Sequence, residues 1–153
     1  MTRPSLFFRA LHAWFLVSRG LTMGVRAAVI DGEGRVFLVR HTYVKGWHLP
    51  GGGVEVGETA AEALAKELRE EANIEATAPP RLLGIAFNTR SSRRDHVLVY
   101  EVRAFRSLGP KAADREIAEA GFFPLDALPE GTTEATRERL AEIREGRPVA
   151  PCW

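Results

Sequence analysis

The stretch KELREEANI, residues 66–74, places three glutamates, Glu67, Glu70 and Glu71, within five positions. Residues three and four apart are neighbours on an α-helix, so these carboxylates share one helix face and repel one another. One explanation is a solvated helix face on which Lys66 pairs with the glutamates four residues before and after it. The other is a divalent cation held between the carboxylates, because Mg²⁺ and Mn²⁺ prefer oxygen ligands.

The residues around this stretch predict a helix from Thr59 to Ala72 that follows a glycine-rich loop. Thr59 and Glu62 have the spacing of a capping box, which begins a helix. The loop before it, GGGVEVGE at residues 51–58, allows the backbone to approach a ligand closely. The apolar face, expected to pack on a sheet, consists of Ala61, Leu64, Leu68 and Ala72. Loop and helix together indicate a metal-assisted phosphate site.

Other catalytic motifs are absent from the sequence. The loop is not a dinucleotide fingerprint, because Val56 occupies the last glycine position counted from Gly51, and it lacks the G-K-[ST] ending of a P-loop. No G-x-S-x-G occurs, which excludes a serine-hydrolase elbow. None of the four histidines forms H-E-x-x-H.

Composition is that of a single globular domain in a reducing compartment. A chain of 153 residues fits one domain with one core. The net charge of +1 gives no indication of DNA or RNA binding. The single cysteine, Cys152, forms no internal disulfide, so we expect a cytoplasmic protein.

Residues 1–20 are expected to form an N-terminal amphipathic helix, and residues 21–153 one catalytic domain. The segment is too short, and too interrupted by Arg9 and His12, to span a bilayer. It has no clear cleavage site of a signal peptide. We expect a helix from Ser5 to Gly20 that packs on the domain or on a partner subunit. Because the first thirty residues contain no acid, a transit peptide, docking on a membrane surface and homodimerisation remain alternatives.

The remaining pattern mixes strands with helices. Residues 22–30 and 35–40 are expected to form a hairpin around DGEG. Further strands are expected at residues 81–90, 96–105 and 116–125. A closing helix at residues 132–146 begins at Thr132 or Thr133 and ends at Gly146. This order predicts an α+β fold in which helices cover a mixed β-sheet.

The segment from Gly52 to Ile74 resembles the signature of the Nudix hydrolases, G-x5-E-x7-R-E-U-x-E-E-x-G-U, where U is aliphatic. The matching residues are Gly52, Glu58, Glu67, Leu68, Glu70, Glu71 and Ile74. The stretches WHLPGGGVEVGE and EIAEAGFFPLDALP are also similar to the family, so the resemblance covers most of Thr22 to Pro129.

Two positions depart from the signature. Asn73 replaces the second glycine, and asparagine tolerates the left-handed conformation that commonly follows a helix. Lys66 replaces the arginine and offers a point charge in place of a bidentate fork. If the arginine orients Glu67 or a neighbour, Lys66 orients it less firmly and lowers activity.

The resemblance implies an α/β/α sandwich and metal-dependent hydrolysis of a pyrophosphate bond in a nucleoside diphosphate derivative. That derivative is a nucleoside triphosphate, a nucleotide sugar, ADP-ribose or a dinucleotide. By resemblance, Glu70 and Glu71 are the main ligands of Mg²⁺ or Mn²⁺, and Glu67 shares a metal or acts as a base. A later acid completes such sites, and the candidates are Glu116 and Glu119. The remaining candidates, which contact the phosphates or support the loop, are Gly52, Gly53, Glu58 and Lys66.

Recognition residues are expected in loops near the site. Tyr43 and Trp47 either stack on a base or sugar or serve as packing residues. Arg90, with Arg93 and Arg94, either meets substrate phosphates or lies at a solvated hairpin tip. The alternative function is a non-catalytic Nudix-fold module that senses a nucleotide, which the Lys66 replacement leaves open.

Overall fold

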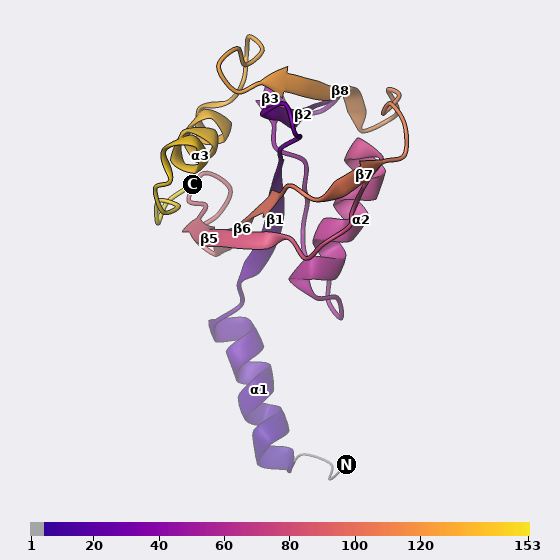
Figure 1. The fold of residues 1–153 in the computed structure, drawn as a ribbon. Helices are drawn as coiled ribbons and strands as arrows, with labels where there is room; N and C mark the ends of the chain where they lie inside the picture. Colours follow the sequence, from indigo (N-terminus) through magenta and orange to yellow (C-terminus); the bar gives the residue numbers. More distant parts are fainter. Residues whose placement is uncertain (1–4) are drawn as a thin grey trace.

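The computed structural model describes residues 5–153 of the chain, and its helices and strands follow one another in a mixed order (Figure 1). The elements are α1 (Leu6–Ser18), β1 (Thr22–Val29), β2 (Arg35–His41), β3 (Trp47–His48), α2 (Ala60–Ala72), β4 (Ile74–Ala76), β5 (Arg81–Phe87), β6 (Asp95–Val102), β7 (Phe105–Ser107), β8 (Ile117–Pro124) and α3 (Glu134–Glu145).

The strands form three small sheets in this part of the chain. The first has the order β1-β6-β5, in which β1 runs parallel to β6 and β5 runs antiparallel to it. The second has the order β3-β2-β8 and is antiparallel, and β4 pairs with β7. Parallel and antiparallel pairs occur together, which confirms the predicted α+β class with mixed strand pairing.

Two cores lie on opposite sides of the strands because alternate side chains of a strand point to opposite faces. Val25 and Val29 of β1 pack with Leu68 of α2 in one core. Ala28 of β1 packs with Leu140 of α3 in the other. Figure 1 shows β1 between α2 and α3. This arrangement confirms the α/β/α sandwich.

The predicted hairpin between β1 and β2 is wrong. The two strands meet only at an isolated bridge between Ile30 and Val36 and then belong to different sheets. The DGEG turn is present, because the Asp31 carboxylate accepts hydrogen bonds from the backbone N–H groups of Glu33 and Arg35. β1 is buried on both faces, which is typical of a central strand with a parallel neighbour rather than of a hairpin arm.

Most of the other expected elements are confirmed, with small shifts at their ends. The strands β5, β6 and β8 lie within or one residue beyond the expected ranges. Helix α3 begins after the N-cap Thr133 and ends at Gly146, whose φ is 65°. The short strands β3, β4 and β7 were not expected, because two or three residues carry no periodicity.

Helix α2 begins at the expected capping box and ends at Asn73, whose φ of 52° is left-handed. Its buried face is rotated from the expected one. Ala63 is buried in place of Ala61, and Glu71 lies on the buried side of the helix. The acidic face and the apolar face therefore overlap at Glu71.

Helix α1 begins after the N-cap Ser5, as expected, but it does not pack on the domain. It has no buried residue, and Figure 1 shows it projecting away from the body of the molecule. Residues 19–21 connect it to β1. The first four residues of the predicted N-terminal segment lie outside the described residues. Among residues 5–153, no helix is long and apolar enough to cross a bilayer.

Candidate active site

The glycine-rich loop lies along the free edge of β1 and extends that sheet without forming a regular strand. The N–H of Val25 donates to the Gly52 carbonyl at 2.8 Å, and the N–H of Ala27 donates to the Pro50 carbonyl at 2.9 Å. Gly51 has a φ of 145°, and a Cβ at this position would lie 2.0 Å from the Val25 carbonyl oxygen. The close approach of the loop to β1 therefore requires glycine here.

The side chain of Arg26, in β1, holds the same loop through hydrogen bonds. Its Nη1 donates to the carbonyl oxygens of Leu49 at 3.0 Å and Gly51 at 2.5 Å. Arg26 was not among the residues predicted to belong to the site. The available signal was a single arginine within the otherwise apolar or small residues of the strand, since a buried charge requires hydrogen-bonding partners.

Two carboxylates of α2 meet the loop. The N–H of Gly51 donates to Glu71 Oε2 at 2.8 Å. A Cβ on Gly52 would lie 2.3 Å from Glu67 Oε1, so the absence of a side chain lets this carboxylate lie against the loop backbone. The structure thus brings Gly52, the first glycine of the signature, against Glu67, and the preceding Gly51 against Glu71.

Glu58 and Lys66 close the other end of the loop onto the helix. Lys66 Nζ lies 3.0 Å from Glu58 Oε1, and the N–H of Glu55 donates to the same oxygen at 2.7 Å. The hydrogen bond that Lys66 donates to Glu58 is the largest cause that raises the pKa of Lys66. Lys66 therefore holds the loop through Glu58, while Gly53 lies in the loop with open space above its Cα.

The buried end of the acidic cluster resists ionisation. Burial raises the pKa of Glu71 to about 7, against the opposing effects of the Gly51 hydrogen bond and Arg26. Burial also raises the pKa of Glu67, and the neighbouring Glu70 adds to this effect. Negative charge in this cluster is therefore incompletely compensated by the protein's own groups.

His41 lies beside Glu71 but does not form an ion pair with it. Its Nδ1 is 3.6 Å from Glu71 Oε1, too long for a hydrogen bond. Burial, together with the positive charge of Arg26 and the neighbouring His48, lowers the pKa of His41 to about 4. The imidazole is therefore neutral near pH 7, and Nδ1 has no hydrogen-bond partner among the described residues.

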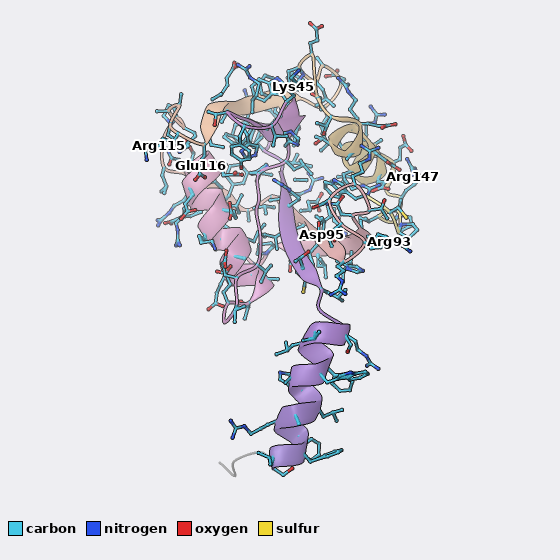
Figure 2. All side chains as sticks on the ribbon, turned by 180° about the vertical axis from the view of Figure 1, so that it is seen from behind. Lys45, Arg93, Asp95, Arg115, Glu116 and Arg147 are labelled. Carbon is cyan, nitrogen blue, oxygen red and sulfur yellow. The ribbon has the colours of Figure 1, made fainter. Side chains whose placement is uncertain are left out.

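Of the two later acids, the structure places only Glu116 near the cluster. Its charge contributes to the raised pKa values of Glu67 and Glu71. Figure 2 shows Glu116 beside α2. Glu119 instead lies opposite Arg40 in the β2–β8 pair and accepts a hydrogen bond from Arg40 Nη2 at 2.6 Å.

The donor set fits a hard divalent cation. Glu67, Glu70, Glu71 and Glu116 offer only carboxylate oxygens, the ligands that Mg²⁺ and Mn²⁺ prefer. A cation here would also relieve the burial and mutual repulsion that raise the pKa values of Glu67 and Glu71. Within residues 5–153, no three acidic, histidine or cysteine side chains are already gathered as a metal-binding group. The side chains border the same region, and binding an ion requires them to turn toward it.

A cavity of about 740 Å³ opens on the other side of the loop. Gly52 and Gly53 line it beside His48 and Arg90. Other lining residues are Thr22, Met23, Gly24, Arg26, Val44, Leu49, Asn88, Ser91, Asp95, Val97, Thr133, Ala135, Thr136 and Trp153. Its volume is in the range of small-molecule sites.

Two residues that line this cavity, Trp153 and Asn88, are held by other side chains. The guanidinium of Arg139 lies 5.6 Å from the centre of the Trp153 ring, and this cation–π contact stabilises the position of the ring. Asn88 donates from Nδ2 to Asp95, and its Oδ1 has no partner among the described residues. The sequence alone gave no sign of either residue, because both reach the cavity through tertiary packing.

The predicted recognition residues have different environments. Tyr43 is exposed, and its ring centre lies 5.1 Å from that of His41. Trp47 is 6% exposed and packs edge-on against Phe123 at 4.8 Å, so the structure gives it the packing role. Arg90 lines the cavity and pairs with Glu134 at 2.9 Å on the surface.

The fold and the glycine loop tied to an acidic helix define a class of domain, and sequence comparison agrees. Residues 20–143 match the family model of the NUDIX domain. The chain therefore belongs to the Nudix hydrolase family.

Individual relatives support the same assignment. The chain is 32% identical over 104 residues to an ADP-ribose pyrophosphatase of Methanocaldococcus jannaschii, covering 66% of this chain and 61% of that protein. The crystal structure of a MutT NUDIX hydrolase from Burkholderia pseudomallei has a TM-score of 0.69 and 28% identity, covering 80% of this chain and 97% of that one. A UDP-X diphosphatase structure has a TM-score of 0.61 and 28% identity, covering 90% and 71%.

The first curated relatives are longer proteins. The chain spans 51%, 41% and 32% of the length of three of them. The similarity thus concerns the shared domain.

Proposed function

We propose that this protein hydrolyses a pyrophosphate bond in a nucleoside diphosphate derivative with the help of Mg²⁺ or Mn²⁺. The observation that carries the proposal is the loop at Gly51 and Gly52, which is bonded to β1 and meets both Glu71 and Glu67 at the edge of a cavity. Membership of the Nudix family supports the same reaction.

Glu70, Glu71 and Glu67 would hold the ion, and Glu116 is the later acid best placed to join them. When bound, the ion supplies an activated water and neutralises charge on the phosphoryl oxygens. Glu67, half-buried and with a raised pKa, is suited to accept a proton from the attacking water. The hydrogen bonds of Gly51 and Arg26 hold the loop backbone in a fixed position relative to the buried Glu71 carboxylate.

The cavity beside the loop would hold the nucleoside. Trp153 offers a ring for stacking on a base. Arg90 is placed to meet a phosphate after leaving Glu134. Relatives described as an ADP-ribose pyrophosphatase and a UDP-X diphosphatase favour a nucleotide joined to a second group.

The test is turnover with a panel of nucleoside triphosphates, nucleotide sugars, ADP-ribose and dinucleotides, with products resolved by mass. We expect Mg²⁺-dependent release of a nucleoside monophosphate or pyrophosphate, and no turnover with a chelator present. Nucleotide binding without turnover of any panel member would reject hydrolysis and support the sensing alternative.

Matched variants test the residues. Glu70→Gln keeps the side-chain shape but removes the charge, so kcat should fall by about 10²-fold or more with the fold intact. Glu116→Gln should lower kcat, whereas Glu119→Gln should not, because Glu119 pairs with Arg40. Equal effects of these two substitutions would contradict the placement of Glu116 in the site.

A further inference from the structure

Helix α1 carries a large apolar surface that no described part of the chain covers. Its exposed apolar side chains, together with Leu21 just beyond it, are between 58% and 81% accessible. They are Leu6, Phe7, Phe8, Trp14, Leu16, Val17 and Leu21. Contiguous exposed apolar surface of this kind marks an interaction site.

The charges on the same helix have one sign. Arg9, His12 and Arg19 fall within an arc of about 80° at 3.6 residues per turn. Most of the large apolar residues occupy the opposite half of the helix, and Leu16 alone interrupts the basic stripe. The first acid in the sequence is Asp31, beyond the helix. The helix is therefore amphipathic with a narrow, purely basic polar face.

The basic surface continues onto the domain where α1 ends. Arg94 Nη1 donates to the Gly20 carbonyl at 3.3 Å, and the N–H of Thr22 donates to the Arg94 carbonyl at 3.0 Å. Figure 2 shows Arg93 on the side of the domain from which α1 projects. Asp95, the acidic residue that follows these arginines, accepts hydrogen bonds from Thr22 and Asn88.

None of the ion pairs formed within residues 5–153 involves the four arginines of this surface. These arginines are Arg9, Arg19, Arg93 and Arg94. Their charges are thus available to a partner that is itself negative.

We propose that α1 docks the protein on an anionic phospholipid surface, lying in the interface with its apolar face toward the acyl chains. A second copy of the chain would bring the same positive charges to the contact, whereas anionic headgroups bring the opposite ones. The helix has 13 residues, which gives a length of about 20 Å, short of the roughly 30 Å of a bilayer core. It therefore lies on the membrane and does not cross it.

The proposal is independent of the hydrolase function, and its test uses the full chain. Sedimentation with vesicles of phosphatidylcholine alone is compared with vesicles that also contain phosphatidylglycerol. We expect binding only to the anionic vesicles and its loss as salt rises from about 0.1 M to about 1 M. Equal binding to both vesicles, or binding to neither, overturns the proposal.

Variants separate charge from apolar contact. Arg9→Glu should weaken binding to the anionic vesicles by about tenfold or more. Lys45→Glu makes the same charge change at the opposite end of the molecule and should leave binding unchanged (Figure 2). Trp14→Glu should abolish binding, while an unchanged thermal transition shows that the domain remains folded. Equal losses for Arg9→Glu and Lys45→Glu would overturn a specific role of α1.

Light scattering on the protein without lipid, as it elutes from a size-exclusion column, tests whether a second copy of the chain covers the apolar face of α1 instead. A monomer that binds anionic vesicles agrees with the proposal. A stable dimer that Trp14→Glu dissociates, together with no vesicle binding, assigns the face to a second copy and overturns it.

Discussion

Helices α1 and α2 have the same length, 13 residues, and opposite environments. Helix α1 is largely apolar and has no buried residue, whereas α2 carries six charged residues and buries five side chains. Helix α2 also has a complete capping box and a left-handed cap at Asn73, while α1 has only the Ser5 cap.

The difference teaches that periodicity and surroundings, more than total hydrophobicity, decide which helix joins a core. Leu64 and Leu68 of α2 recur at the spacing of one face and meet apolar residues of β1 and β2. In α1 most of the large apolar side chains lie on the half of the helix opposite its basic stripe, and no sheet face among residues 5–153 covers them. Such a helix requires a different partner.

The largest expected contrast in stability comes from equivalent leucines of the two helices. Leu68→Ala should lower the free energy of unfolding by about 2–5 kcal/mol, because the side chain is fully buried and its loss leaves a cavity. Leu16→Ala should change it little, because Leu16 is 65% exposed. Chemical unfolding measures both. A loss above about 1 kcal/mol for Leu16→Ala would show that α1 packs on the domain in solution.

The buried acid of α2 gives a pH-dependent contrast. With a chelator present, Glu71→Gln should stabilise the protein by about 1–3 kcal/mol at pH 8. The folded pKa of Glu71 is about 7 and its ordinary value is 4.5. Below pH 4.5 the carboxyl is protonated in both states, and as the pH rises through 7 the native protein loses this stability while the glutamine variant does not.

Thermal unfolding from pH 4.5 to pH 8 measures this prediction. The gap between the two proteins should open with rising pH and stay nearly constant above 7. Addition of Mg²⁺ at pH 8 should raise the transition of the native protein more than that of Glu71→Gln. A gap independent of pH would contradict a raised pKa at Glu71.

Sequence reasoning was most successful where local signals and packing agree. The cap at Thr59, the left-handed Asn73 and the ends of α3 all follow from short-range chemistry. The hairpin expected around DGEG failed because the turn is local but the partner of β1 is β6, far along the chain. Strand pairing of this kind depends on burial of both faces, which a turn motif does not report.

The candidate site also contains residues that the sequence identifies and residues that only the three-dimensional structure reveals. Family spacing identified the glutamates of α2, whose ligand roles stay predictions, and the structure places Glu67 and Glu71 against the loop. Arg26 and Trp153 were missed, because their roles depend on which segments lie beside the loop in three dimensions. Burial of Glu71 was missed because a helix face was assigned as either apolar or acidic, and here one residue belongs to both.

The two N-caps provide a smaller contrast. Thr59→Ala should cost about 1 kcal/mol, since its hydroxyl accepts from the Glu62 N–H and the Glu62 carboxylate accepts from the Thr59 N–H. Ser5→Ala should leave the unfolding of the domain unchanged, because α1 contributes no buried residue to it. Equal shifts in the chemical unfolding midpoint would show that both helices belong to one cooperative unit.

The smallest expected effect concerns Lys66, where α2 departs from the family signature. An arginine fork could hold both oxygens of Glu58, which Lys66 now contacts at 3.0 and 3.3 Å. Because this pair lies at the surface end of the loop and not at Glu67, Lys66→Arg should change kcat/KM by less than about fivefold. Steady-state kinetics at saturating Mg²⁺ measures this, with Arg69→Lys on the same helix as the control for a conservative change. A gain of a hundredfold or more would instead show that the arginine position acts on Glu67 in the working site and that lysine disables it.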